Sequence, residues 1–384
     1  MSVSRRQFVS ALGLGGTGLL AAPSLLARGR EAAPRSAPAP WVDASPFGTQ
    51  ASPLRLDSNE NPNGPSRRAL EALQGMLGEA NRYPDDHEEA LAAAIAREHG
   101  IPREHIVLGC GSSETLRQCV QAFTSPTAGL VTAAPSFELP VDVARLLGHP
   151  VTAVPVGAGL ALDLERMAAA SAGAGLVFLC NPNNPTATVH DDAAVRGFIA
   201  QVQRTAPGAT VLVDEAYHEY VDHPGYRTAI PLAVADPRVV VSRTFSKVHG
   251  MAGLRAGYAI AHRDTARRLQ AFRLGSGVNA LAAAAAMASV GDRAHVAEEQ
   301  RKNREAKAFT RGFFERAGYT VGPSDTNFLM IDLRRDPASF RAACRANGVA
   351  VGRPFPPLTN WLRISIGTLD EMQRASAVFQ RLLG

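Results

Sequence analysis

The chain is poor in cysteine, and its cysteines show no metal-binding spacing. Four cysteines occur in 384 residues, and each stands in an apolar or helical context. A chain of this length buries a core large enough to fold without disulfide bonds. We therefore expect no disulfide framework and no metal site, and buried free thiols at Cys110, Cys119, Cys180 and Cys344.

Lysine is almost absent, although the chain is basic. Of the 40 basic residues, three are lysines: Lys247, Lys302 and Lys307. Arginine stays protonated in proteins, whereas a lysine amine can lose its proton and act as a nucleophile. Lys302 and Lys307 lie in the polar stretch AEEQRKNREAKAF, which predicts a solvated helix face. Lys247 stands apart from them and is the candidate for amine chemistry.

The chain also lacks a concentrated patch of one charge beyond its N-terminus. The formal net charge is +5, and it is spread along the sequence without a polybasic run or a basic stripe interleaved with aromatic residues. Proteins that bind nucleic acid normally carry such a patch. We therefore expect no nucleic-acid partner.

The N-terminus has the features of an export signal. The sequence SRRQF at residues 4–8 precedes the apolar run ALGLGGTGLLAA and a stretch rich in proline and alanine. This pattern predicts a twin-arginine signal peptide and linker over residues 1–40. The apolar run is short and glycine-rich for a membrane span, which favours cleavage after Ala22 or Ala27 over retention as an anchor. The expected location is the periplasm, reached through the twin-arginine export machinery.

From about residue 106, short apolar runs alternate with longer helical patterns. The runs are IVLGC, GLVTAA, LVFLC, TVLVDE, VVVSRTF and RAGYAIA. Such alternation predicts an α/β fold with a mainly parallel sheet covered by helices on both faces. Ligands bind outside the carboxyl ends of parallel strands, so the polar residues that follow each run predict the functional site.

Several of these runs end in chemically informative residues. Gly111, Ser112 and Ser113 open a helix, where free N–H groups can bind an anion, although an ordinary N-cap is the alternative. Asn184 lies in the turn NPNNPT, whose amides can donate to a ring oxygen or serve only a rigid turn. Asp214 ends a buried run, where a carboxylate requires a cationic partner.

Together with Lys247, these residues match the requirements of pyridoxal 5'-phosphate. That cofactor needs a lysine for its aldehyde, a carboxylate that keeps its pyridine nitrogen protonated, and an anion cradle for its phosphate. A dinucleotide site is the weaker alternative, because GCGSSE breaks the G-x-G-x-x-G spacing. The sequence therefore predicts a pyridoxal phosphate enzyme whose lysine is Lys247.

From about Leu54 to the C-terminus, the chain resembles the fold-type I pyridoxal phosphate enzymes, specifically the histidinol-phosphate aminotransferase branch of the class I/II aminotransferases. The shared motifs, in the family's order, are LDSNENPNGP, RYPD, GCGSSETL, APSFELP, NPNNPT, VDEAYHEY, TFSKVHGMAGLRAGY, TNFLM and LRISIGT. The resemblance implies a large cofactor-binding domain over residues 82–274, whose seven-stranded sheet contains one antiparallel strand. Residues 41–81 and 275–384 would form a smaller α+β domain.

The resemblance also assigns roles around the cofactor. It implies that Lys247 holds the cofactor as a Schiff base and moves the reacting proton, while Asp214 pairs with the pyridine nitrogen. Tyr217 and Asn184 would bind the ring's O3', and Phe137 would stack on the ring in place of the usual tyrosine. The implied phosphate-binding residues are Gly111, Ser112, Ser113, Thr244, Ser246 and Arg255.

Further roles concern the substrate and a second subunit. Arg363 and Arg353 match the residues that bind the substrate's carboxylate or phosphate. Tyr83 matches a tyrosine that reaches the cofactor of the neighbouring subunit, which implies a homodimer with shared active sites. One departure concerns Ala187, which replaces a glycine at the end of the NPNNPT turn and raises the question of the local geometry.

The expected function is transamination by a ping-pong mechanism. The donor would be histidinol phosphate or an aromatic or aliphatic amino acid, and the acceptor an oxo acid such as 2-oxoglutarate. A lyase similar to the amino-acid phosphate decarboxylases is one alternative, and a non-catalytic exported binding protein is the other. Retention of Lys247, Asp214, Tyr217 and Arg255 argues against the non-catalytic alternative.

The export signal can be tested by replacing both Arg5 and Arg6 with lysine. Lysine keeps the positive charge but not the twin-arginine motif, so folded, cofactor-loaded enzyme should accumulate in the cytoplasm. Cell fractionation followed by immunoblotting measures the distribution. An unchanged amount of protein outside the inner membrane would refute the twin-arginine signal.

Overall fold

The structure, a computed structural model, describes residues 53–383 of the chain. The predicted signal peptide and linker over residues 1–40 lie outside the described residues, as does the beginning of the 41–81 segment. Within the described part, no helix is both long and apolar enough to cross a membrane.

The main sheet has seven strands in the order β2-β8-β7-β6-β5-β3-β4. The strands are β2 Ile106–Cys110, β3 Leu130–Ala134, β4 Val151–Pro155, β5 Leu176–Cys180, β6 Thr210–Asp214, β7 Val239–Thr244 and β8 Ala256–Ala261. Strand β8 runs antiparallel to β2 and β7, and the remaining pairs are parallel. This confirms the predicted α/β fold with a mainly parallel seven-stranded sheet.

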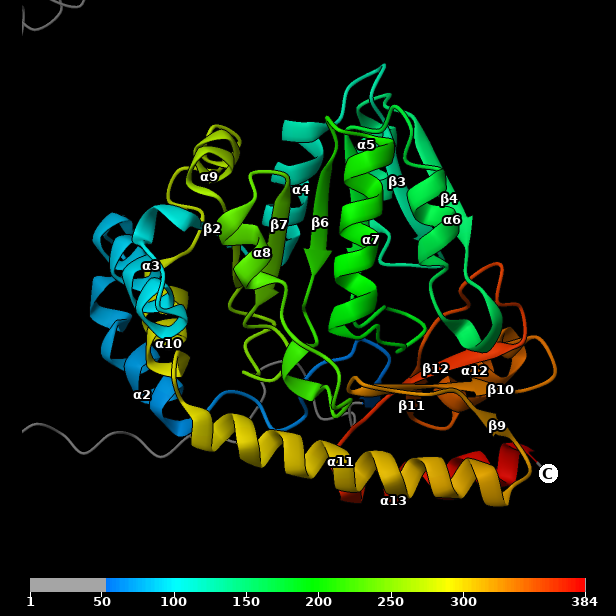
Figure 1. Ribbon diagram of the computed structural model, residues 1–384. Coiled ribbons are helices and arrows are strands. Elements are labelled where there is room, and N and C mark those ends of the chain that lie inside the picture. Colours follow the sequence, from blue (N-terminus) through cyan, green and yellow to red (C-terminus); the bar gives the residue numbers. More distant parts are fainter. Residues whose placement is uncertain (1–52, 384) are drawn as a thin grey trace, which may run out of the picture. The chain divides into compact units, whose positions relative to one another are not determined.

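Helices surround this sheet and connect its strands (Figure 1). The α-helices are α2 Arg67–Gly75, α3 Asp85–His99, α4 Ser112–Phe123, α5 Leu139–Leu146, α6 Leu164–Ala169, α7 Asp192–Thr205, α8 Ile230–Ala235, α9 Arg263–Gln270, α10 Ala280–Ser289, α11 Arg293–Arg316, α12 Pro337–Ala346 and α13 Leu369–Leu383. The short 3-10 helices are η1 Leu77–Glu79, η2 Arg103–His105, η3 Ala158–Leu160 and η4 His218–Tyr220.

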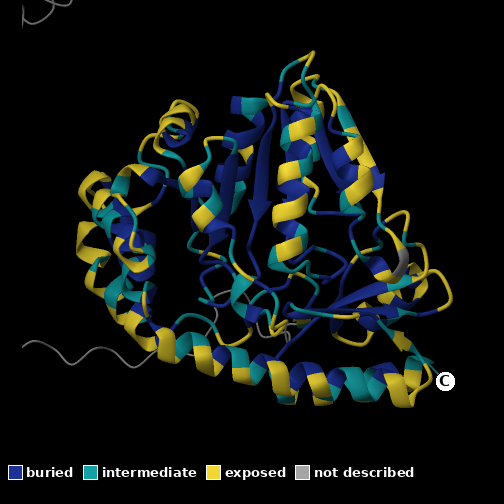
Figure 2. Cartoon of the chain, in the orientation of Figure 1, coloured by how far each residue is buried: buried dark blue, intermediate teal, exposed yellow. Residues whose placement is uncertain are grey.

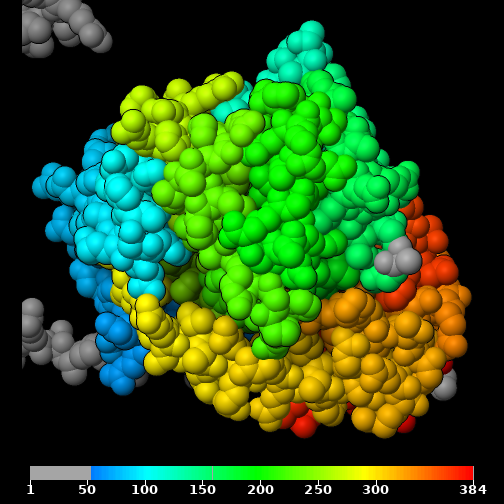
Figure 3. Space-filling model, in the orientation of Figure 1, coloured from blue at the N-terminus to red at the C-terminus, as the bar shows by residue number. Residues whose placement is uncertain are grey.

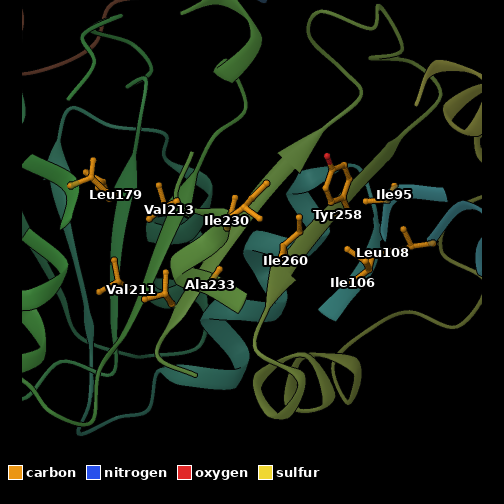
Figure 4. Packing of buried hydrophobic residues seen from close by; sticks show 14 of the residues in the cluster. Ile95, Ile106, Leu108, Leu179, Val211, Val213, Ile230, Ala233, Tyr258 and Ile260 are labelled. Carbon is orange, nitrogen blue, oxygen red and sulfur yellow. The ribbon is translucent and has the colours of Figure 1, made fainter. Parts of the chain in front are cut away.

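Both faces of the main sheet are buried, which explains why its strands read as continuous apolar runs. On β6, Val211 and Val213 point into one core with Ile230 of α8, as Figure 4 shows. Leu212 points to the opposite core, which α4, α5 and α9 cover. Figure 2 shows the resulting pattern of buried strands and helices with exposed outer faces. The sheet is therefore held rigid, and its strand ends provide fixed positions for polar residues.

The C-terminal part of the chain, together with the segment at Leu54–Leu56, forms smaller sheets with a core of their own. The strands are β1 Leu54–Leu56, β9 Thr320–Val321, β10 Phe328–Asp332, β11 Val349–Val351 and β12 Trp361–Ser365. Strand β1 pairs with β11, while β12, β10 and β9 form a three-stranded antiparallel sheet. Helix α11 leads from α10 to these sheets along one edge of the structure (Figures 1 and 3). The domain boundaries at residues 82 and 274 stay a prediction.

The polar helix α11 differs from its predicted solvated face at one lysine. Lys302 is partly exposed and pairs with Glu299 at 2.9 Å, but Lys307 is only 9 % exposed. Its Nζ donates to the carbonyl oxygens of Ser324 at 3.0 Å and Thr326 at 3.1 Å. The expectation was wrong for Lys307 because these carbonyls of a tight loop replace water around the ammonium group.

Candidate active site

A cavity of about 480 Å³ lies where the carboxyl ends of the parallel strands meet the start of α4 and the smaller sheets. Most of the predicted site residues line it: Ser112, Ser113, Phe137, Asn184, Asp214, Tyr217, Thr244, Ser246, Lys247, Arg255, Arg353 and Arg363. Gly111 adjoins it as the residue before α4. The parallel sheet thus collects residues from distant parts of the chain at one edge, as its topology predicts.

Asp214 is a buried carboxylate without a full set of partners. It ends β6, its exposed fraction is 3 %, and its Oδ1 has no hydrogen-bond partner among the described residues. Burial raises the pKa of Asp214 to about 7, and the nearby charge of Lys247 partly opposes that rise. A buried oxygen with unused lone pairs is stabilised by a cationic N–H donor. The site therefore calls for such a donor inside the cavity.

Lys247 follows β7, and its amine lies close to the ring of Tyr217. The Nζ donates to the carbonyl oxygen of Asn59 at 3.1 Å and lies 5.4 Å from the centre of the Tyr217 ring. Burial, assisted by the positive charge of Arg363, lowers the pKa of Lys247 to about 8. A depressed pKa makes the neutral, nucleophilic amine accessible near neutral pH.

Asn59 holds the lysine and the tyrosine in place, and sequence reasoning gave it no role. Its Nδ2 donates to the Tyr217 hydroxyl at 3.1 Å, and its Oδ1 accepts from Ser365 Oγ at 2.8 Å. Asn59 therefore ties β12 to the residues at the end of the main sheet. The motif LDSNENPNGP contains Asn59, but a motif does not say which side chains the residue contacts.

The start of α4 and a nearby arginine form an anion cradle. The Arg255 guanidinium donates to Ser113 Oγ at 3.3 Å and to Ser246 Oγ at 3.4 Å. Within residues 53–383, Arg255 forms no ion pair with an acidic side chain. Gly111 has a positive φ of 71°, and a Cβ at this position would collide with the Arg255 guanidinium. A helix N-terminus, two hydroxyls and an unpaired cation together suit a phosphate group.

The two predicted substrate arginines differ in exposure and in partners. Arg363 is 8 % exposed, and it donates to Asn184 Oδ1 at 2.7 Å and to the carbonyl oxygen of Asp57 at 2.6 Å. Its Nε has no partner among the described residues, and burial lowers the pKa of Arg363 to about 10. Arg353 is about half exposed and forms an ion pair with Glu138. Among the described residues, Arg363 therefore forms no ion pair, whereas Arg353 already has a counter-ion.

Two further residues named from the sequence, Tyr83 and Ala187, do not line the cavity. Tyr83 is 85 % exposed and does not line the cavity of its own chain. Ala187 is buried and has a φ of 64°, so the turn keeps the left-handed geometry that a glycine would adopt. The replacement of that glycine thus leaves the turn intact at the expense of local backbone strain.

The cavity fits pyridoxal 5'-phosphate at each of its recognition groups. The orphaned Oδ1 of Asp214 matches a protonated ring nitrogen, Lys247 matches the aldehyde, and the cradle around Arg255 matches the phosphate. When bound, this cofactor supplies a protonated ring that accepts the electron pair left on the substrate's α-carbon. The fold and the site together define a fold-type I pyridoxal phosphate enzyme.

Comparison with known proteins specifies the family. The family model "Aminotransferase class I and II" matches residues 51–379, and the chain belongs to this family. A histidinol-phosphate aminotransferase of Symbiobacterium thermophilum is 38 % identical over 335 residues, which cover 86 % of this chain and 91 % of the relative. An aromatic amino acid aminotransferase of Thermobifida fusca is 36 % identical over 318 residues, which cover 83 % of this chain and 87 % of the relative.

Solved structures agree with this family. A histidinol-phosphate aminotransferase from Sinorhizobium meliloti, in complex with pyridoxal-5'-phosphate, has a TM-score of 0.80 at 28 % identity and covers 86 % of this chain and 91 % of its own. An L-threonine-O-3-phosphate decarboxylase from Porphyromonas gingivalis has a TM-score of 0.72 at 23 % identity, covers 86 % of this chain and 99 % of its own, and shows the fold alone. The protein is a pyridoxal phosphate-dependent transaminase.

The buried carboxylate leads to a prediction about the apoenzyme. Since the pKa of Asp214 is raised, the folded chain holds this proton more tightly than the unfolded chain. That stabilisation is lost progressively as the pH rises from the ordinary pKa of 3.8 through about 7. Asp214→Asn mimics the protonated carboxyl group. Because the carboxyl of Asp214 is already ionised in the unfolded chain at pH 5.5, the variant apoenzyme should be more stable than the unsubstituted apoenzyme at both pH values. This advantage should be about 1–3 kcal/mol larger at pH 8 than at pH 5.5.

Denaturant unfolding of both apoenzymes at the two pH values measures this difference. Titration with the cofactor is the complementary measurement, because the variant should bind it more weakly. A stability difference that is the same at pH 5.5 and pH 8 would show that Asp214 is not strained in the empty site.

Proposed function

We propose that the protein transfers the amino group of histidinol phosphate or a related amino acid to an oxo acid of the 2-oxoglutarate type. The observation that carries this proposal is the set of arginines around the cavity, because Arg341, Arg353 and Arg363 all line it. Both substrates of such a reaction carry a carboxylate or a phosphate, which guanidinium groups bind in a bidentate manner. The names of the relatives, histidinol-phosphate and aromatic amino acid aminotransferases, support the same class of donor.

The chain's own residues divide the work as follows in this proposal. Asp214 holds the proton on the ring nitrogen of the cofactor, and Tyr217 and Asn184 bind the ring oxygen next to the reacting carbon. Lys247 would take the proton from the substrate's α-carbon through its neutral Nζ. The pKa of Lys247, lowered to about 8, supports this role because a proton must be taken and returned near neutral pH.

The two substrate arginines differ in burial, and we assign a different anionic group of the substrate to each. Within the described part of the chain, the Nε of Arg363 has no partner, and the side chain is nearly inaccessible to water. Arg363 is therefore the residue for the anion that every substrate carries. Arg353 lies at the cavity mouth, where it can reach a second anion on the more distant part of a substrate. The distal carboxylate of the acceptor would occupy this second position. The phosphate of histidinol phosphate, which is that donor's only anionic group, would contact both arginines.

We also propose a homodimer in which Tyr83 completes the partner's phosphate site. Tyr83 is exposed, and further apolar side chains nearby are exposed as well, including Leu274 at 63 %. The two segments lie side by side, because Ser276 Oγ donates to Asp85 Oδ1 at 3.0 Å. Exposed apolar patches of this kind mark protein interfaces. Sedimentation equilibrium that gives a monomeric holoenzyme would contradict this proposal.

The proposed location is the periplasm, supported by the sequence at residues 4–8. Export by the twin-arginine machinery would deliver an enzyme that has already folded around its cofactor. The proposal adds a constraint on the donor, which must then be a compound available outside the inner membrane.

Alanine substitutions separate the candidate donors. Arg363→Ala should reduce kcat/KM by roughly 30- to 1000-fold with any donor, since it removes a charge-assisted contact of about 2–4 kcal/mol. Arg353→Ala should be comparably impaired only if the donor carries a phosphate. With an unphosphorylated amino acid, its kcat/KM should fall by about tenfold or less, as for an exposed contact.

Steady-state kinetics with a panel of amino donors, including histidinol phosphate, provides the measurement. Lys302→Ala is a suitable control, because that lysine lies on α11 outside the cavity. A strong loss in Arg353→Ala with an unphosphorylated monoanionic donor would contradict the division of roles. Holoenzyme without activity toward any amino donor would contradict the proposed function as a whole.

A further inference from the structure

Arg353, which is partly exposed, has an acidic partner to which the proposed reaction assigns no role. Glu138 precedes α5 in the loop after β3, and its Oε2 accepts a hydrogen bond from Arg353 Nη2. The other terminal nitrogen of Arg353, Nη1, donates to the carbonyl oxygen of Pro354 at 3.0 Å. Both Glu138 and Arg353 line the cavity. A carboxylate of the protein therefore occupies the position where a distal substrate anion would bind.

The neighbouring aromatic ring brings the two arginines together. The Arg353 guanidinium lies 4.3 Å from the centre of the Phe355 ring, and the Arg363 guanidinium lies 4.8 Å from the same ring. The two cations thus present adjacent anion positions within one cavity. Arg363 has no acidic partner among the described residues, whereas Arg353 has Glu138. Of the two positions, only the second has an acidic side chain in direct contact within residues 53–383.

Transamination places two substrates in this cavity in turn, and they differ in charge at their distal end. We propose that Glu138 is a specificity-determining residue that acts as an exchangeable counter-ion of Arg353. A distal carboxylate or phosphate displaces Glu138 from Arg353, and Glu138 returns when the bound substrate has an uncharged side chain. This proposal rests on the proposed function, because it concerns the same cavity and the same two arginines.

Because both side chains of the pair are partly exposed, the exchange should cost little free energy. The side chains of Arg353 and Glu138 are 45 % and 55 % exposed, and ion pairs at this exposure are weak. Glu138 can therefore leave Arg353 and be hydrated without a large penalty. At the same time, its negative charge repels a second anion near Arg353. Glu138 should thus lower the affinity for dianionic substrates while leaving monoanionic ones unaffected.

Binding of unreactive probes to the holoenzyme tests this inference without turnover. Glutarate carries two carboxylates with the spacing of 2-oxoglutarate, and butyrate lacks the distal one. Glu138→Gln keeps the size of the side chain but removes its charge. Its Kd for glutarate should fall by about three- to tenfold, and its Kd for butyrate should stay within about twofold, as measured by isothermal titration calorimetry.

A double-mutant cycle checks that Glu138 acts through Arg353. In an Arg353→Ala background, Glu138→Gln should change the Kd for glutarate by less than about twofold. Glu89→Gln is the matched control, since Glu89 forms a similar partly exposed pair with Arg103 outside the cavity. This control should change neither Kd.

Three results would overturn the role of Glu138. They are an unchanged Kd for glutarate in Glu138→Gln, an equal change for both probes, and a full effect that persists without Arg353. These outcomes differ from a failure of the proposed function, which would appear as absence of turnover with every amino donor. An active enzyme with unchanged glutarate binding in Glu138→Gln would refute the counter-ion alone.

Discussion

The rest of the site depends on a carboxylate that the fold buries without a complete set of partners. Asp214 lies at the end of β6, the middle strand of the main sheet. One of its oxygens has no hydrogen-bond partner among the described residues, and burial raises its pKa. Such a group destabilises an empty protein, and a cationic ring nitrogen removes the penalty. The same burial lowers the pKa of Lys247. One low-dielectric environment thus raises the pKa of the carboxylate and lowers the pKa of the amine, as a site for a protonated pyridine ring and a reactive lysine would require.

The parallel sheet makes this environment possible, because its buried strands fix their carboxyl ends while loops contribute the polar groups. The smaller sheets contribute further side chains that contact these polar groups. Asn59 joins Lys247 and Tyr217 to Ser365 of β12, and Arg363 of the same strand reaches Asn184 in the turn after β5. Movement of the smaller sheets would therefore disturb substrate recognition and the lysine together.

The sequence predicts the parts of the fold and site that depend on local pattern. Runs of β-branched residues identify strands that are buried on both faces, and the residues after them line the cavity. Strand β4 escaped notice because it is an edge strand whose Thr152 and Ala153 are exposed, so no continuous apolar run marks it. The contacts of Asn59 and Glu138 could not be predicted, because no local pattern reports them. Asn59 contacts residues that lie 158 and 306 positions away in the sequence, and Glu138 contacts a residue 215 positions away. Lys307 shows the same limit. Its polar neighbours in the sequence predict exposure, but in the fold its amine is buried and donates to two carbonyl oxygens of a later loop.

We expect Lys247 to be the residue to which the cofactor is covalently attached. Borohydride reduction of the holoenzyme, followed by proteolysis and mass spectrometry, tests it most directly, because reduction makes the linkage permanent. The cofactor's mass should appear on the peptide that contains Lys247 and on no peptide that contains Lys302 or Lys307, and Lys247→Arg should carry no covalent label. A label on another lysine, or full turnover by Lys247→Arg, would contradict it.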